Sequence, residues 1–154
     1  MKKLSKSVSS TLKIGRAISR HLQPGDIILL SGTLGAGKTV LAKGIAQGLG
    51  ISKDKVISPT FVLLRIHKGK HPLHHFDFYR LKTPHDILAL GYEEYFYSEG
   101  ITLIEWPERL KFLLPKEFLK IKLSAKAANS RLLHFIASGA GYKRLLESIK
   151  DKLN

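Results

Sequence analysis

Cysteine is absent from the chain, and this absence excludes disulfide bonds, thiolate catalysis and zinc sites built on cysteine. The sequence also lacks an apolar run approaching the ~20 residues that a membrane-spanning helix needs. Its basic N-terminus is not followed by the apolar segment that a secretory signal peptide carries. These absences predict a soluble cytoplasmic protein that does not enter a membrane.

Acidic residues are scarce, because 12 Asp and Glu stand against 26 Lys and Arg, which gives a formal net charge of +14. The basic surplus falls in residues 1–31 and 111–154, whereas residues 32–110 are nearly balanced. Such a surplus attracts a phosphate backbone, but it can equally form a solvated surface. Composition therefore leaves two hypotheses, contact with nucleic acid or an acidic partner, and a surface that keeps the protein in solution.

Hydrophobic residues make up 44% of the 154 residues, which is enough to bury a real core. No internal repeat, low-complexity tract or linker divides the chain. Residues 1–154 are therefore predicted to form one domain.

A glycine-rich segment follows a short apolar run at residues 27–30 and matches the pattern G-x-x-x-x-G-K-[ST]. Glycines let the backbone N–H groups form a concave site for anionic oxygens. Lys38 can reach the β- and γ-phosphates of a nucleotide, the Thr39 hydroxyl can ligate Mg²⁺, and a helix starting near Lys38 adds its dipole. The segment is predicted to be a P-loop. Its residues expected at the phosphates are Gly32, Leu34, Gly35, Ala36, Gly37, Lys38 and Thr39.

The rest of the chain alternates between predicted helices and strands. Strands are predicted at residues 56–66, 73–78, 101–105, 118–123 and 132–136, the first two forming a hairpin around Gly69. Helices are predicted at residues 7–22 (capped by Ser9, Ser10 or Thr11), after the P-loop, from Thr83, at 107–115 and at 142–149, with a short helix or lid at 91–97. The predicted fold class is α/β: a single P-loop NTPase-like domain whose mixed, mostly parallel central sheet is flanked by helices, with peripheral hairpins.

Hydrolysis of a bound nucleotide requires a carboxylate for Mg²⁺ and a group that orients the attacking water. Asp77 and Glu105 end two predicted apolar strands, where a phosphate site is usually completed. Asp77 could instead pair with Arg80, and Glu105 could be an exposed acid at a strand end. Thr60 could sense the γ-phosphate as a switch threonine does, or it could be an ordinary strand residue.

Four histidines surround the predicted hairpin turn: His67, His71, His74 and His75. Their mixed spacing and the absence of cysteine argue against a structural zinc site, so we expect imidazoles on a basic surface loop. Four aromatic residues could stack on a base or pack in a core or interface: Tyr92, Tyr95, Tyr97 and Trp106.

Taken in order, four segments give the sequence a specific resemblance. They are residues 34–39 (L-G-A-G-K-T), 58–61 (S-P-T-F), 75–81 (H-F-D-F-Y-R-L) and 103–108 (L-I-E-W-P-E). With Arg131 as a further matching position, the chain resembles the TsaE family, the YjeE-type P-loop ATPases, over residues 7–137. One residue departs from the family pattern, because Thr33 stands where the family usually has Asp.

The resemblance implies a Mg·ATP site. Residues 32–39 would hold the ATP phosphates, and Thr39 and Glu105 would ligate Mg²⁺. Asp77 would assist the metal or the attacking water, and Thr60 would lie near the γ-phosphate. The resemblance also implies a group of residues near adenine or ribose, with Trp106 beside the site. This group is Thr11, Glu108 and Arg131.

The resemblance also implies an accessory role in threonylcarbamoyl-adenosine modification of tRNA. The protein would be a slow ATPase that is stimulated by a TsaB–TsaD complex and resets this complex between rounds, without transferring the threonylcarbamoyl group itself. The basic termini would then contact tRNA or the complex. Two alternatives stay open: a P-loop small-molecule or nucleoside kinase using Arg65 or Arg80, and a basic nucleic-acid-binding module whose P-loop is vestigial.

Overall fold

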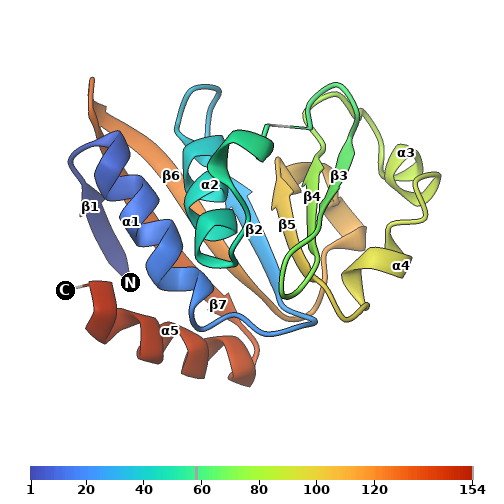
Figure 1. Ribbon diagram of the computed structural model, residues 1–154. Helices are drawn as coiled ribbons and strands as arrows, with labels where there is room; N and C mark the ends of the chain where they lie inside the picture. The colour runs from blue at the N-terminus through green and yellow to red at the C-terminus, as the bar shows by residue number, and fades with distance from the viewer. Residues whose placement is uncertain (58, 154) are drawn as a thin grey trace.

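A seven-stranded sheet forms the centre of the fold (Figure 1). The computed structural model describes residues 1–57 and 59–153. In these residues the strands are β1 (Lys2–Ser5), β2 (Ile27–Ser31), β3 (Leu64–His67), β4 (Leu73–Asp77), β5 (Ile101–Glu105), β6 (Phe118–Ala127) and β7 (Ser130–Ser138). They lie in the order β1-β7-β6-β2-β5-β4-β3. The central strands β6, β2, β5 and β4 are parallel, and the others pair antiparallel, which confirms the predicted mixed sheet and α/β class.

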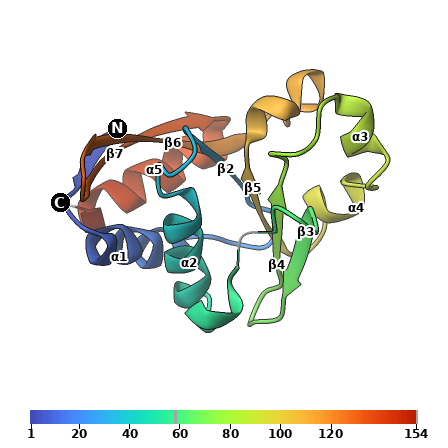
Figure 2. The same ribbon diagram turned by 90° about the horizontal axis from the view of Figure 1, so that it is seen from above.

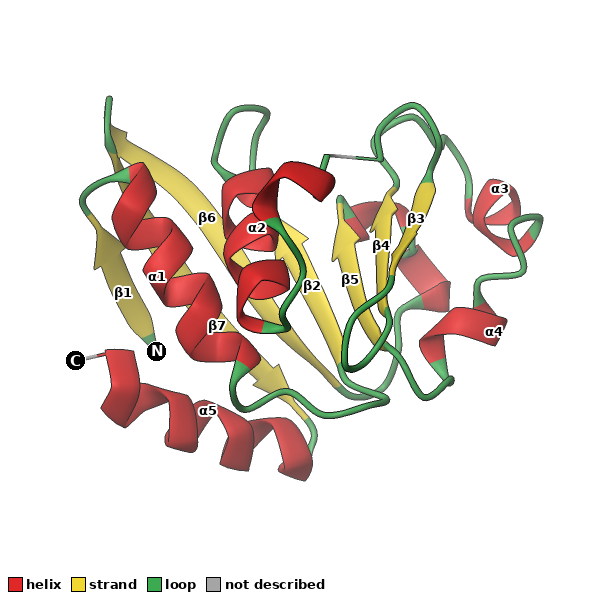
Figure 3. Ribbon diagram, viewed as in Figure 1, coloured by secondary structure: helices red, strands yellow, loops and turns green. Residues whose placement is uncertain are grey.

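Helices flank this sheet on both sides (Figure 3). The α-helices are α1 (Val8–Ser19), α2 (Lys38–Gly48), α3 (Pro84–Leu88), α4 (Glu93–Phe96) and α5 (Ala140–Leu153). Three short 3₁₀ helices are η1 (Lys53–Lys55), η2 (Pro107–Arg109) and η3 (Lys111–Leu113). Figures 1 and 2 place α1, α2 and α5 on one side of the sheet, and α3 and α4 beyond β4 and β5.

The central strand β2 separates two hydrophobic cores. Because side chains alternate along a strand, Ile28 and Leu30 join the larger core with α1, α2 and α5, while Ile27 and Leu29 join the smaller core with α3 and α4. All four side chains are buried. The strand that leads into the P-loop is thus fixed from both faces, which gives the loop a rigid base.

Most predicted elements are found, with boundaries that differ by a few residues. The predicted cap of the first helix is wrong: Ser7, in an extended conformation, is the N-cap, and its side chain accepts a hydrogen bond from the Ser10 backbone N–H. The predicted start of α3 is confirmed, since Thr83 and Asp86 form a capping box. The short strand β1 was not predicted, and residues 107–113 form two 3₁₀ helices in place of one helix.

The predicted strand at residues 56–66 is wrong over most of its length. Within the described residues the strand begins only at Leu64, although its hairpin with β4 is confirmed. Residues 60–63 form a turn, and with Pro59 we call this segment the 59–63 turn. The backbone N–H groups of Val62 and Leu63 both donate there to the Pro59 carbonyl, at 3.0 and 2.6 Å. Leu63 has a φ of 66°, which interrupts an extended chain. The predicted motif residue Ser58 lies outside the described residues.

Candidate functional site

The glycine-rich loop connects the end of β2 to the first residue of α2. Gly37 is the N-cap of α2 with a φ of 101°, a conformation that favours glycine. Gly32 has a φ of 142°, and a Cβ atom there would collide with the carbonyl oxygen of Leu123 on β6. The loop therefore lies against the sheet in a path that requires glycine, and the N–H groups of the first turn of α2 point toward the space above it.

Lys38 is 5% exposed and its ammonium group is turned back onto the loop. It donates hydrogen bonds to the carbonyl oxygens of Gly32 at 2.7 Å and Thr33 at 2.9 Å, and it lies 4.2 Å from the centroid of the Trp106 ring. Burial lowers the pKa of Lys38, and the nearby Glu105 carboxylate opposes this shift. Thr33 contributes its backbone carbonyl to this contact, so the contact does not depend on which side chain stands at this position.

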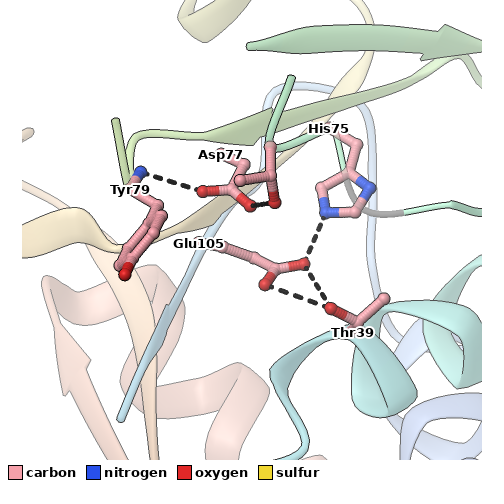
Figure 4. Close-up of polar contacts among 6 residues, drawn as sticks. Thr39, His75, Asp77, Tyr79 and Glu105 are labelled. Atoms are coloured by element: carbon pink, nitrogen blue, oxygen red, sulfur yellow. Dashed lines mark hydrogen bonds and ion pairs between the residues drawn. The ribbon is translucent and has the colours of Figure 1, made fainter. Parts of the chain in front are cut away.

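Glu105, at the end of β5, faces the first turn of α2 (Figure 4). It is only 2% exposed, so the alternative of an exposed acid at a strand end is wrong. The Thr39 hydroxyl lies 3.4 Å from both carboxylate oxygens, and Nε2 of His75 lies 2.9 Å from Oε1. A hydroxyl and a carboxylate side by side are the hard oxygen ligands that Mg²⁺ prefers.

Asp77, at the end of β4, pairs in register with Glu105 on the neighbouring parallel strand. Its Oδ2 accepts a hydrogen bond from the Thr60 hydroxyl at 2.6 Å, and its Oδ1 accepts one from the Tyr79 backbone N–H at 2.9 Å. The alternative ion pair with Arg80 is not found among the described residues, and the Arg80 guanidinium lies over a phenyl ring. The two predicted carboxylates therefore lie at adjacent strand ends, as the sequence indicated.

Thr60 lies in the turn before β3, so it is not the ordinary strand residue that the sequence left as an alternative. Its hydroxyl group ties this turn to the Asp77 carboxylate. The contact links the segment that matched S-P-T-F to the strand that matched H-F-D-F-Y-R. Its role near a γ-phosphate stays a prediction.

These groups converge on one cavity of about 420 Å³. Its lining residues come from the loop, the first turn of α2, the 59–63 turn and the ends of β4 and β5: Leu34, Gly35, Gly37, Lys38, Thr39, Val40, Thr60, Asp77, Tyr79, Glu105 and Trp106. Segments distant in the sequence thus supply one concave, partly polar space beside the loop. Two larger hollows, of about 800 and 510 Å³, lie elsewhere. They contain none of the residues of the phosphate-binding motif, so the chemistry favours the smaller cavity.

The three residues expected near adenine or ribose lie outside the lining of this cavity. Thr11 is 3% exposed, and its hydroxyl lies 2.8 Å from the Ser5 hydroxyl, which joins α1 to β1. Glu108 lies 4.0 Å from Lys120 in a partly exposed ion pair. Contact of these two residues with a nucleotide stays a prediction.

Arg131 connects the P-loop to the β6–β7 hairpin. Its Nε donates to the Ala36 carbonyl oxygen at 3.1 Å, and its Nη1 donates to the carbonyl oxygens of Ala127, Ala128 and Ser130. The guanidinium therefore fixes the loop to the hairpin turn. Contact of Arg131 with a nucleotide stays a prediction, as it does for Thr11 and Glu108.

The expectation of histidines on a surface loop is wrong for three of the four. His67, His74 and His75 are buried on β3 and β4, and burial lowers the pKa of the first two. His71 lies in the turn between these strands. Within the part of the chain that the structure describes, no three His, Cys, Asp or Glu side chains form a metal-binding group, so a cation at Glu105 would need further oxygens from its ligand.

Sequence reasoning missed the position of His75 beside Glu105. Because His75 and Asp77 are two residues apart on β4, their side chains lie on the same face, and Asp77 pairs with Glu105. The register therefore places the imidazole diagonal to the Glu105 carboxylate, within reach of a hydrogen bond. The available signal was this spacing of two in the segment 75–77.

The aromatic residues divide between the two roles left open. Tyr92 is buried in the smaller core, where its ring packs edge-on against Phe96. Tyr95 packs at the edge of the same core, whereas Tyr97 is 69% exposed. Trp106 lies against Lys38 and Tyr79 at the cavity, so of these four it is the ring placed to contact a ligand.

The helices of the described residues include none with the length and apolarity to cross a membrane. The sheet order, the buried parallel strand β2 and the glycine-rich loop before α2 define an α/β domain of the P-loop NTPase-like class. The sequence model of the family described as "Threonylcarbamoyl adenosine biosynthesis protein TsaE" matches residues 5–133. The chain belongs to the TsaE family.

Known relatives extend this match over most of the chain. It is 39% identical over 131 residues to the tRNA threonylcarbamoyladenosine biosynthesis protein TsaE of Treponema pallidum, covering 85% of this chain and 96% of that protein. It is 38% identical over 140 residues to the TsaE protein of Bacillus subtilis, covering 90% and 87%. The crystal structure of Bacillus subtilis YdiB superposes with a TM-score of 0.84 at 32% identity, covering 100% of this chain and 96% of that one.

Proposed function

We propose that this protein is a Mg²⁺-dependent ATPase that serves threonylcarbamoyl-adenosine modification of tRNA. The observation that carries the proposal is the convergence of Thr39, Glu105 and Asp77 on the cavity beside the P-loop. Family membership supports the pathway, since the relatives are tRNA threonylcarbamoyladenosine biosynthesis proteins. The proposed reaction yields ADP and phosphate.

The loop and α2 are suited to hold the phosphates of ATP. Backbone N–H groups at the start of α2 supply donors and the positive end of the helix dipole. Lys38 supplies a full positive charge once its ammonium group moves from the Gly32 and Thr33 carbonyls to the phosphates. The loop residues assigned to this role are Gly32, Leu34, Gly35, Ala36, Gly37, Lys38 and Thr39.

Thr39 and Glu105 are the residues that would hold Mg²⁺, and their adjacent oxygens fit it. When bound, the metal would neutralise negative charge that develops on the phosphate oxygens. His75 contributes by donating Nε2–H to Oε1 of Glu105, which fixes the carboxylate toward α2. Because His75 is fully buried, its ring has little freedom to turn away from this contact.

Asp77 is the residue proposed to orient the attacking water. Its two oxygens already accept hydrogen bonds from Thr60 and from the Tyr79 backbone, which fix the carboxylate plane. Each carboxylate oxygen can accept more than one hydrogen bond, so Asp77 is proposed to accept one from a water in the cavity as well. Thr60 belongs to the 59–63 turn, so a movement of this turn would move the hydroxyl group that Asp77 contacts.

The proposed partner is a complex of the TsaB–TsaD type, which the ATPase would reset between rounds of modification. A regulatory ATPase is expected to hydrolyse slowly alone and faster with its partners. The test is ATP hydrolysis by the purified protein alone, with the TsaB–TsaD complex, and with tRNA added. A rate near ~10 s⁻¹ for the isolated protein, typical of an ordinary enzyme, would contradict the regulatory role.

A matched pair of lysine variants tests the assigned nucleotide site. Lys38→Ala should abolish hydrolysis, because it removes the charge that reaches the phosphates. Lys43→Ala, on the same helix α2, removes the same charge outside the cavity lining and should retain activity. Full activity of the Lys38 variant would contradict the site, and transfer of phosphate to a small molecule would favour the kinase alternative.

A further inference from the structure

The strands β1, β7 and β6 form a part of the sheet that is covered on one face. Along β6, Leu119, Ile121 and Leu123 are buried in the larger core, whereas Lys122 between them is exposed. The same alternation continues through β7 and β1, and Figure 2 shows α1 and α5 on the buried side only. The outward-facing residues of these strands, which we call the open face, include Lys2, Leu4, Lys120, Lys122, Leu132, His134 and Ile136.

The open face is basic. Lys2, Lys120 and Lys122 lie on it, and the three strands contain no acidic residue. Among the described residues, no carboxylate lies within ion-pair distance of Lys2, Lys122 or the exposed Lys126 near the hairpin tip. Lys120 differs, because Glu108 lies 4.0 Å from its ammonium group.

Cross-strand register places the cations of the open face in one row. Lys2 pairs with His134, and His134 pairs with Lys122 on the other side. Neighbouring strands lie ~4.8 Å apart, so the two lysines are separated by roughly 10 Å, with an imidazole between them. At this separation, which is about one Debye length at physiological salt, the two lysines repel only weakly, and both can attract the same polyanion.

We propose that the open face binds the phosphate backbone of RNA. Phosphate contacts dominate the affinity of proteins for nucleic acids, and a row of unpaired lysines on a sheet supplies them. The polyanion of the family's pathway is tRNA, which favours RNA over an acidic protein or an anionic membrane. The apolar members Leu4, Leu132 and Ile136 are aliphatic and offer no ring for base stacking, so binding should show little sequence preference.

This inference deepens the proposed function by assigning a surface to one of its partners, and it rests on that function for the choice of tRNA. Its residues lie outside the lining of the nucleotide cavity. Loss of RNA binding and loss of ATP hydrolysis can therefore be measured separately. If the open face does not bind RNA, the proposed ATPase function still stands, and the reverse also holds.

The experiment measures binding of a fluorescent tRNA transcript by anisotropy between about 50 and 200 mM salt. The test variant carries Lys2→Gln, Lys122→Gln and Lys126→Gln, all at exposed positions. The control carries Lys13→Gln, Lys143→Gln and Lys150→Gln, which are exposed on α1 and α5 and remove the same charge from the opposite side.

The test variant should bind tRNA at least ~10-fold more weakly and lower the slope of log affinity against log salt by up to ~3. The control should stay near the wild type, and both variants should keep the thermal midpoint and the ATP hydrolysis rate. Equal weakening by the control would overturn the proposal, since binding would then follow net charge alone. It would also be overturned if the wild-type protein bound anionic vesicles or the TsaB–TsaD complex through these lysines but did not bind tRNA.

Discussion

Asp77 and Glu105 occupy equivalent positions on neighbouring parallel strands, yet their surroundings differ. Each ends its strand, each is 2% exposed, and the two residues pair in register. Glu105 contacts Thr39 and His75, which belong to α2 and β4. Asp77 contacts Thr60 in the 59–63 turn and the backbone just beyond its own strand.

The difference shows which carboxylate has a fixed position and which one can shift when a neighbouring segment moves. Helix α2 and strand β4 are packed in hydrophobic cores, so Glu105 is fixed by parts of the protein that move together. Asp77 is tied to the 59–63 turn, in which the side chain of Phe61 is 79% exposed. Under the proposed function, Glu105 would hold the metal at a fixed position, and the contribution of Asp77 to hydrolysis would depend on the position of the turn.

Glu105→Gln should have the largest effect, because it removes the charge of the proposed metal ligand while keeping the shape of the side chain. We expect kcat for ATP hydrolysis to fall ~10³-fold and the Mg²⁺ requirement to rise, since one metal contact is worth several kcal/mol. Steady-state kinetics across a Mg²⁺ series measures both. Glu94→Gln, on the exposed surface of α4, is the control and should match the wild type.

Asp77→Asn should come second, with kcat reduced ~10²-fold, within the range for a group that positions or deprotonates a nucleophile. The amide oxygen can still accept from the Tyr79 backbone N–H, and the amide NH₂ group can donate to the Thr60 hydroxyl in the reverse direction, so the local structure is retained. The Mg²⁺ concentration for half-maximal rate should stay close to the wild-type value. A rise as large as that of Glu105→Gln would erase the distinction between the two carboxylates.

His75 allows the proposed Mg²⁺ site to be tested without changing Thr39 or Glu105, the two residues proposed to bind the metal. His75→Leu should raise the Mg²⁺ concentration for half-maximal rate ~10-fold, as loss of a hydrogen bond that orients a metal ligand commonly does. His75→Gln can still donate to Glu105 and should restore most of the affinity. A merely structural role would instead lower the thermal midpoint of both variants with no difference in Mg²⁺ dependence.

Thr60→Val should have the smallest effect, reducing kcat roughly 5-fold, the equivalent of one hydrogen bond of about 1 kcal/mol. Thr102→Val serves as a matched control, because its buried hydroxyl donates to the Tyr95 carbonyl away from the cavity. The control should lower the thermal midpoint and leave kcat unchanged. If Thr60→Val instead lowered the thermal midpoint and left kcat unchanged, Thr60 would support folding and would not position Asp77.

The P-loop and both carboxylates could be predicted from the sequence because each depends on local signals. The glycine pattern specifies loop, lysine and threonine together, and an acid that ends an apolar strand projects from the same sheet edge as the loop. The hairpin at Gly69 and the cap at Thr83 are likewise local. These features require no knowledge of how distant strands pair.

The features that escaped prediction depend on pairing between distant segments. The contact of His75 with Glu105 requires the register of β4 against β5. The edge strand β1 has four residues, too few for a clear alternation, and is stabilised by pairing with β7. The turn at residues 60–63 is an exception, because it is local: the Pro59 carbonyl accepts two backbone hydrogen bonds there, in a segment whose pattern predicted a strand.

If ATP binds as proposed, the contact of Lys38 with the Gly32 and Thr33 carbonyls would compete with the ATP phosphates for the ammonium group. The apparent affinity for ATP would then be the intrinsic affinity multiplied by the fraction of molecules whose ammonium group has left these oxygens. A partner that shifts the loop could therefore tighten ATP binding without touching the nucleotide. The P-loop would then be regulated by the release of its own lysine.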